Sequence, residues 1–472
     1  MSSESIAGRV WRGLRSIANA SSLETTITNL PDVVLSSIFQ HLHWKEKLMA
    51  VKAFPAWNRI LHSSLGFKHF ENDREYAQSV QALVSNNYLL EEITCIAQYG
   101  QFFTHAVIWL EVFPSADNPE ETDLALLGAL ATHCFRLKSL VIYHPPKLSP
   151  SSIMRSGARY IKPLQRMFSF NPSLDLSLCR VSFLSEGTQA GLCKLLDWYQ
   201  EHNVLQKVAC LDFSHGKMES TLRPMNSLVY CTSLRVLKCP IQYLNTQILQ
   251  QLVEFNLQEL CLISDVHTGH LFYDEQSAID WHGLQLIPGR NLMVHYVFRY
   301  DDVVLCPNPY ARSLALDSLC DGISRDVLIS IADTYGATLE MFSIIEDVWY
   351  PSDDLVNFSD LEDLPTTFQY LASRLTCVHT VVLNLFIPKD ALISLARHAP
   401  ALKTLLVYEH KILFGEHAAN TEVEELKQII SEALGYSWKP LSENDTFYEL
   451  SAYRKSLLFE DFFLDWLDSW SV

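Results

Sequence analysis

Glycine is scarce in this sequence, at 16 of 472 residues, against the roughly 7% that is usual in globular proteins. This scarcity argues against a barrel or sandwich rich in tight hairpins, and against loops that cradle phosphate groups. The motifs GxxxxGKS/T, GxGxxG, HExxH and GxSxG are also absent. Because the sequence offers no credible active site, we expect a protein that is not an enzyme and has no cofactor.

Basic side chains are in the minority, with 36 Lys and Arg against 54 Asp and Glu, so the formal net charge is −18. Such a surface repels phosphate backbones, and we therefore expect no nucleic-acid partner. No apolar run approaches the ~18–20 residues that span a bilayer, and residues 1–25 hold no apolar core of a secretory signal. We expect no membrane partner and a cytoplasmic and/or nuclear location.

Cysteine pairs are missing as well, since none of the eleven cysteines forms a CxxC motif and several lie inside apolar runs. Buried thiols in a reducing compartment explain this distribution. His267 and His270 have a spacing that suits a metal, but no second cluster completes four ligands and Gly269 indicates a turn. We interpret this stretch as a polar loop and expect no metal site.

The first residues carry a short basic pattern, with Arg9, Arg12 and Arg15 placed among apolar side chains. The pattern suits a transit peptide or a helix on a membrane surface. Because chain termini are generally poorly ordered, we interpret residues 1–25 as a flexible arm.

The clearest helical signal begins at Pro31, which suits a first helical turn because its missing N–H would have no partner there. Asp32 adds a negative charge at the positive end of the helix dipole. Apolar residues then follow at i, i+3, i+4 and i+7, namely Leu35, Ile38, Phe39 and Leu42. The spacing predicts one amphipathic helix with a continuous apolar stripe.

Two more helices are expected after a polar break at residues 43–45. Leu48 and Val51 indicate the second, and Pro55 opens a third that carries Trp57. Three helices in about forty residues are close to the size at which a domain needs a staple or a partner. No disulfide or metal pattern supplies a staple, so we expect an apolar face that another protein completes. The alternative is a structural unit packed on the rest of this chain.

These residues resemble the F-box, the adaptor-binding motif of the F-box protein family. The resemblance is carried, in register and without gaps, by Leu30, Pro31, Asp32, Ile38, Phe39, Leu42 and Trp57. Val33, Lys47 and Phe54 depart from the family pattern. The resemblance implies that residues 26–70 bind an adaptor protein through Leu30, Pro31, Val34, Leu35, Ile38, Phe39, Leu42, Leu48, Val51 and Trp57.

Beyond residue 70, the chain repeats an amphipathic helical stretch followed by an x-L-x-x-L-x-L pattern. The strand copies lie at residues 137–142, 208–213, 234–239, 257–262, 339–344, 378–383 and 402–407, with weaker copies near Phe103 and Ala311. One helix and one short strand cannot bury their apolar faces alone, whereas stacked copies can. The pattern predicts parallel strands with helices outside them.

The series resembles the leucine-rich repeats that often follow an F-box, although its period drifts and the asparagine position is mostly missing. The predicted fold class is α/β: a small N-terminal three-helix F-box followed by an irregular leucine-rich-repeat solenoid with parallel strands and outer helices. We expect the repeat domain at 71–412 and a C-terminal helical cap and tail at 413–472. An ordinary layered α/β domain is the alternative.

One acidic segment is unusual, because ten carboxylates and no Lys or Arg occur from Asp326 to Ser373. It suits a solvated loop between repeats, or a docking loop for a basic partner segment with aromatic side chains as anchors. On the second interpretation the substrate-binding residues are Trp349, Tyr350, Asp353, Asp354, Phe358, Asp360 and Asp363.

Together, the two resemblances imply a substrate-recognition subunit of an SCF-type cullin-RING ubiquitin ligase. The implied partners are the SCF adaptor protein and, through it, the cullin scaffold and the RING subunit. A protein substrate is also implied, and it is basic if the acidic segment binds it. The chain would contribute proximity and no chemistry. The alternative is a non-catalytic leucine-rich-repeat scaffold with no ligase role.

Overall fold

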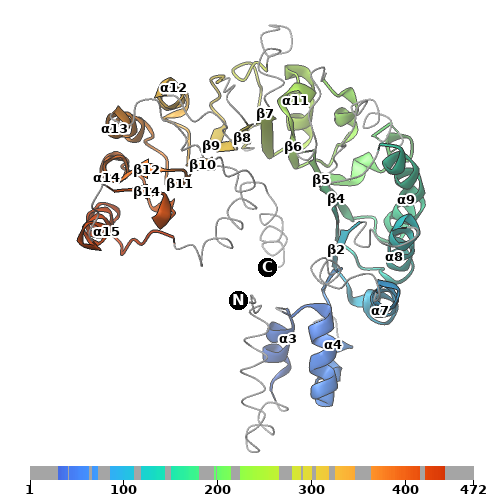
Figure 1. Ribbon diagram of the computed structural model, residues 1–472. Coiled ribbons are helices and arrows are strands. Elements are labelled where there is room, and N and C mark those ends of the chain that lie inside the picture. Colours follow the sequence, from blue (N-terminus) through green and yellow to red (C-terminus); the bar gives the residue numbers. More distant parts are fainter. Residues whose placement is uncertain are drawn as a thin grey trace, which may run out of the picture. The chain divides into compact units, whose positions relative to one another are not determined.

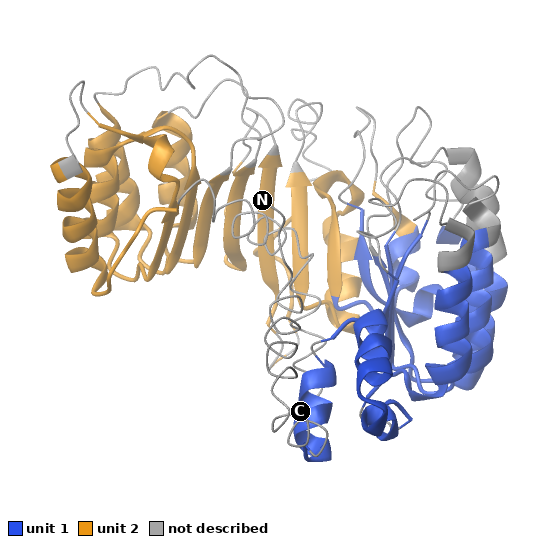
Figure 2. Ribbon diagram, turned by 60° about the horizontal axis from the view of Figure 1, so that its bottom comes forward, with its two compact units in different colours: residues 1–217, 227–235 blue, residues 218–226, 236–472 orange. Residues whose placement is uncertain are grey.

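The computed structural model describes most of the chain, which divides into two compact units. The described residues are 30–40, 42–62, 66–72, 85–110, 119–143, 150–179, 196–197, 199–213, 224–264, 279–286, 288, 291–299, 305–317, 325–345, 363–414 and 420–441. The first unit holds residues 1–217 and 227–235, and the second holds residues 218–226 and 236–472 (Figure 2). The N-terminal arm expected at 1–25 lies outside the described residues.

Three short helical elements open the described part of the first unit. They are α3 (Asp32–Gln40), α4 (Trp44–Ala53) and a 3-10 turn, η1 (Pro55–Trp57), that continues directly into α5 (Asn58–Leu61). Pro55 stands at the first position of η1, where a missing N–H costs nothing. The three helices expected from the sequence are present, and the identification of this helical unit as an F-box stays a prediction.

Parallel strands follow in the first unit and pair in chain order. They are β1 (His69–Glu71), β2 (His105–Trp109), β3 (Ser139–Tyr143), β4 (Asp175–Cys179) and β5 (Val208–Asp212). Helices α7 (Ser85–Tyr99), α8 (Pro119–His133) and α9 (Pro150–Phe170) lie on one side of these strands (Figure 1). Each strand therefore contacts the strand of the neighbouring repeat, and each helix stacks on the neighbouring helix.

The second unit has the same arrangement. Its strands, paired in parallel in this order, are β6 (Val236–Pro240), β7 (Glu259–Ser264), β8 (Met293–Arg299), β9 (Ala311–Asp317), β10 (Met341–Ile345), β11 (Thr380–Asn384) and β13 (Thr404–Val407). The helices on one side of them are α11 (Thr246–Phe255), α12 (Arg325–Tyr335), α13 (Leu364–Arg374) and α14 (Lys389–His398) (Figure 1). A separate short pair joins β12 (Ile387–Pro388) to β14 (Ile412–Leu413).

The alternation of side chains along each strand explains why a leucine pattern builds this fold. Successive residues point to opposite faces of a sheet, so residues two apart share a face. In β8, the Tyr296 ring lies 5.7 Å from the Tyr335 ring at the end of α12, which shows that this set faces the helices. The register places the same set in the neighbouring strands, namely Cys239, Leu262, Leu314, Phe342, Val381 and Leu405. All of them are buried.

The α/β class and the parallel strands expected from the sequence are confirmed, and every expected stretch contains a strand. In the main parallel series, the leucine pattern misses β1, β4 and β8. In β4, Leu174, Leu176 and Leu178 recur two residues apart, and the register pairs Leu176 and Leu178 with Leu140 and Ile142 of β3, so the three-residue step of the pattern is missing. In β8, Val294 and Phe298 flank Tyr296 in place of leucine.

Buried thiols are expected from the sequence, and six cysteines of the described chain are buried: Cys95, Cys134, Cys210, Cys231, Cys239 and Cys261. Burial raises the pKa of Cys95 and of Cys231 to about 12. Both thiols therefore stay protonated and unreactive near neutral pH. Cys306 and Cys377 are exposed.

The last described segment completes the second unit beyond β13. Helix α15 (Asn420–Leu434) packs on α14, and the indole N–H of Trp438 donates to the Leu405 carbonyl at 2.8 Å. Leu441 then joins the edge of the sheet, since its N–H donates to the Val407 carbonyl at 2.8 Å and its carbonyl accepts from the Glu409 N–H at 2.9 Å. These contacts cover a sheet edge that would otherwise present unpaired backbone groups.

Two glycines give opposite expectations for substitution. At Gly336, just after α12, a Cβ would lie 2.4 Å from the Ala332 carbonyl oxygen and 2.6 Å from the Arg374 carbonyl oxygen. Because backbone atoms of α12 and α13 cannot give way easily, Gly336→Ala should destabilise the fold by about 1–3 kcal/mol. At Gly128, inside α8, no atom lies within 4 Å of the added Cβ. Gly128→Ala should stabilise the fold by about 0.5–1 kcal/mol through its higher helix propensity.

Urea unfolding followed by circular dichroism measures both variants against the parent chain. Equal destabilisation by the two changes would contradict the close backbone approach at Gly336.

Candidate protein-docking surfaces

The inner face of α3 forms a small core within the helical unit. Leu35 and Phe39 are both fully buried, and the Phe39 ring meets the Trp57 ring edge to face with 6.0 Å between centroids. Phe54 stacks on Trp57 at 4.6 Å. Such aromatic pairs contribute about 0.5–1.5 kcal/mol each beyond the burial of their area. The unit is thus packed around Trp57 by its own residues.

One flank of α3 remains open. Pro31, Val34 and Ile38 are spaced three and four residues apart and therefore share this flank. Pro31 is exposed, Val34 is 43% exposed, and Ile38 is half-buried, as is Leu42 just beyond the helix. Val33, which is 80% exposed, projects from a different side of the helix. The stripe expected from the sequence therefore splits into a buried part and an open part, and we call Pro31, Val34, Ile38 and Leu42 the open flank.

Helix α4 attaches the helical unit to the first strand and to α7 through buried aromatic rings. The Trp44 ring lies 6.2 Å from that of Phe70 in β1, and Phe70 stacks on Phe103 at 5.2 Å. A second stack joins Phe67 to Tyr99 of α7 at 4.5 Å. All five side chains are buried, and we call them the aromatic joint. These ring contacts hold the helical unit against β1 and α7.

Lys47 lies against this aromatic joint although it is charged. Its side chain is 3% exposed, and its Nζ lies 5.2 Å from the centroid of the Phe67 ring. Burial lowers the pKa of Lys47 to about 8, and only the nearby Cys95 acts in the other direction. The resemblance gave Lys47 as a departure at an apolar position. The structure accommodates it because its stem packs as an apolar chain while its cation faces an aromatic ring.

Polar contacts fix the ends of the two helices. The Arg59 Nε donates to Asp32 Oδ1 at 2.7 Å, and the Arg59 Nη2 donates to the Leu30 carbonyl at 3.2 Å. The His43 N–H donates to Glu46 Oε2 at 2.9 Å and so caps the start of α4. Exposed pairs of this kind contribute little to stability. The two Arg59 bonds link the start of α3 to α5.

The ten residues expected to bind an adaptor all belong to the helical unit, but they differ in burial. Leu35, Phe39 and Trp57 are buried; Leu30, Ile38, Leu42, Leu48 and Val51 are half-buried; Pro31 and Val34 are exposed. Sequence reasoning missed the aromatic joint, because Phe70, Tyr99 and Phe103 lie outside the motif in separate elements. The available signal was the run of aromatic residues that follows the third helix, beginning with Phe67.

Six of the seven residues expected to bind substrate lie outside the described residues: Trp349, Tyr350, Asp353, Asp354, Phe358 and Asp360. The seventh, Asp363, is exposed just before α13, and its Oδ2 accepts from the Arg325 NH1 at 2.8 Å. Arg325 directly precedes the segment without Lys or Arg. Asp363 is therefore already paired within the chain, although an exposed pair of this kind contributes little to stability.

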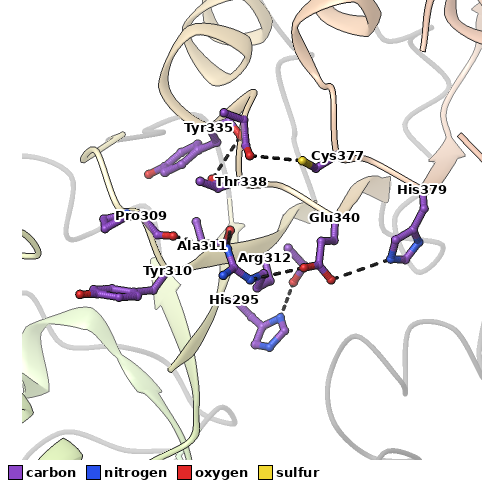
Figure 3. Close-up of polar contacts among 12 residues, drawn as sticks. His295, Pro309, Tyr310, Ala311, Arg312, Tyr335, Thr338, Glu340, Cys377 and His379 are labelled. Atoms are coloured by element: carbon purple, nitrogen blue, oxygen red, sulfur yellow. Dashed lines mark hydrogen bonds and ion pairs between the residues drawn. The ribbon is translucent and has the colours of Figure 1, made fainter. Parts of the chain in front are cut away.

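A polar row runs along the ends of β8 to β11 in the second unit (Figure 3). Glu340 lies between Arg312, at 3.4 Å from the Arg312 Nε, and His379, at 3.9 Å from the His379 Nε2. His295 Nδ1 and Ser313 Oγ lie 2.7 Å apart. Burial and then the Arg312 charge lower the pKa of His295 to about 4, so its ring is neutral near pH 7. The row therefore presents both hydrogen-bond donors and hydrogen-bond acceptors along β8 to β11.

The described residues were also searched for metal sites and for membrane-spanning helices. Within the described ranges, no group of three or more His, Cys, Asp and Glu side chains is placed to hold a metal ion. Nor is any helix in that part of the chain long and apolar enough to cross a membrane. His267 and His270 lie outside the described residues.

Comparisons with known proteins show a distant likeness to a solved structure. No protein-family model matches the sequence, and no curated protein matches it. A chain in the crystal structure of the Rad7 and Elc1 complex in yeast aligns with a TM-score of 0.40 and 12% sequence identity. The alignment covers 89% of this chain and 97% of that chain.

The buried Lys47 makes the stability of the first unit depend on pH. Its folded pKa, about 8, lies below the ordinary value of 10.5. Between these values the unfolded chain binds the Lys47 proton more tightly than the folded chain, so stability rises as the pH is raised through this window. In urea unfolding, the parent chain should gain up to about 3 kcal/mol relative to Lys47→Met between pH 7 and pH 10.5.

Lys52→Met is the matched control, since it removes an exposed lysine from the same helix. A difference between the parent chain and Lys47→Met that stays constant over this pH range would contradict the burial of the cation.

Proposed function

We propose that this chain is a substrate-recognition subunit of an SCF-type cullin-RING ubiquitin ligase. In this proposal the helical unit docks on the SCF adaptor protein, which connects it to the cullin scaffold and the RING subunit. The repeats bind a protein substrate. The chain catalyses no reaction itself, and it acts by raising the concentration of the substrate near the ubiquitin-conjugating enzyme.

The open flank of α3 is the observation that carries this proposal. It exposes apolar side chains on a helix whose other face is already packed on Trp57. A helix surface of this kind gains free energy when it enters an apolar groove of a partner. The flank also coincides with the stretch that resembles an F-box. The aromatic joint supports the proposal because it fixes the flank relative to the first repeat.

A permanent repeat scaffold without a ligase role is the alternative, and the open flank would then bind a different protein. Co-purification separates the two. A ligase receptor should carry the SCF adaptor at one-to-one stoichiometry, whereas a scaffold should carry another partner or none.

A charge on the open flank should abolish adaptor binding without unfolding the helical unit. Val34→Asp combined with Ile38→Asp places two carboxylates where an apolar groove is expected, and burying an unpaired charge costs several kcal/mol. The affinity for purified adaptor should fall by about 100-fold or more, as measured by isothermal titration calorimetry. Leu35 and Phe39 are unsuitable for this test, because aspartate at either position would disrupt the core around Trp57.

Val33→Asp is the matched control, since it makes the same chemical change on a different side of α3. It should leave the adaptor affinity unchanged. Undiminished binding by the double variant would reject the proposed docking surface, and absence of adaptor binding by the parent chain would reject the ligase role.

The acidic segment gives a separate test of substrate recognition. If it docks a basic partner segment, replacing Asp353, Asp354, Asp360 and Asp363 by Asn should abolish capture of that partner at physiological salt. Adaptor binding should be unaffected. Capture that persists in this variant would mean that the segment is only a solvated loop between repeats.

A further inference from the structure

Basic side chains gather in one part of the first unit, against the charge of the whole chain. Residues 124–174 contain seven Lys and Arg and no Asp or Glu, although the formal net charge of the chain is −18. Four of the seven have described side chains, and all four are exposed: Arg136, Lys138, Lys162 and Arg166. A run of one charge sign is often only a solvated face, so its surroundings decide its meaning.

The chain does not neutralise these four cations with its own described carboxylates. Within the described residues, none of the four forms an ion pair with Asp or Glu, as several arginines elsewhere do. The two carboxylates that bound the segment have other partners. Asp123 is buried and accepts from the Tyr160 hydroxyl at 3.1 Å, and Asp175 pairs with Arg235. The four cations therefore remain available to an anionic partner.

Two exposed phenylalanines lie at the same place. Phe135 follows α8 and Phe170 ends α9, two helices that pack side by side (Figure 1). The side chains are 49% and 48% exposed, and their rings meet edge to face with 5.3 Å between centroids. Singly exposed apolar residues are ordinary, but two rings in contact offer a continuous apolar surface.

Short spacings place the cations next to the two rings. Lys162, Arg166 and Phe170 are four residues apart on α9 and therefore share one flank of it. Arg136 directly follows Phe135 in the chain. From residue 162 to residue 170 the helix rises about 12 Å, and neighbouring helices lie about 8–10 Å apart. We call these side chains the basic aromatic surface: Phe135, Arg136, Lys138, Lys162, Arg166 and Phe170.

Charge complementarity selects an acidic peptide segment as the ligand of this surface. Carboxylates accept paired hydrogen bonds from Arg, and an apolar side chain packs on the exposed rings. An extended segment of about four to six residues covers the available length. Nucleic acid fits less well, because a duplex carries one negative charge per about 1.7 Å and continues beyond this surface over a chain of negative net charge.

We propose that the basic aromatic surface docks a short acidic segment of a partner protein, in which carboxylates flank an aromatic or aliphatic residue. The surface belongs to the repeats of the first unit and shares no residue with the open flank of α3. The inference therefore goes beyond the ligase role and does not rest on it, and loss of this docking should leave adaptor binding unchanged.

Fluorescence anisotropy with the full chain and a labelled octapeptide of six aspartates and two phenylalanines tests the proposal. Arg136→Glu combined with Arg166→Glu should weaken binding at least 10-fold, because attraction becomes repulsion. Raising the salt from about 50 mM to about 500 mM should also weaken it. The matched control, Arg397→Glu combined with Lys403→Glu, makes the same change of net charge at exposed positions of the second unit and should leave the affinity unchanged.

Absence of peptide binding by the parent chain, or equal weakening by both glutamate variants, would overturn the proposal. If the first glutamate variant fails to fold, Arg136→Gln combined with Arg166→Gln decides, because it removes both charges without repulsion and should still weaken binding at least 3-fold. Serine in place of both phenylalanines of the peptide should also weaken binding, and unchanged affinity would contradict the role of the rings. Tighter binding of a single-stranded oligothymidylate of equal charge would assign the surface to nucleic acid and overturn the proposal.

Discussion

Parallel pairing of each strand with the next strand along the chain is the constraint on which both units depend. A parallel connection must pass over one face of the sheet, and it is right-handed almost without exception, so successive helices collect on the same side. The residues two apart in each strand then face those helices, as Tyr296 and its register partners do. Hydrophobic burial within each unit is therefore shared between neighbouring repeats and belongs to no single one.

The aromatic joint gives the first unit its second organising contact. A three-helix unit near forty residues has little core of its own, and here Trp57 provides one part of it while Phe70, Phe103 and Tyr99 provide the rest from later elements. The joint tolerates the buried cation of Lys47 at an energetic cost. It follows that the helical unit is packed inwards on this chain and is open along one flank of α3.

The sequence predicted the element types and the class of fold from short periodic patterns. The three helices and the strands at seven main and two weaker stretches are present, because their apolar spacing sets which face is buried. It missed β1, β4 and β8: β4 lacks the three-residue step of the pattern, and in β8 Tyr296 stands where the pattern has leucine. For the candidate site, the pattern identified the helix but not its orientation. Whether Phe39 or Val34 faces inwards depends on Trp57 and on the packing of later elements, and these are contacts between residues far apart in sequence.

The spacing between consecutive strands has a consequence for how such a chain can change over evolutionary time. β9 begins 18 residues after β8, at Ala311 after Met293, whereas β11 begins 39 residues after β10, at Thr380 after Met341. The strands pair in parallel across both the short and the long connection. Lengthening a surface loop also costs little entropy. Lineages can therefore insert or delete residues between strands without shifting the repeats on either side. Rapid divergence in length and sequence, with the backbone plan retained, is the expected history of such a protein.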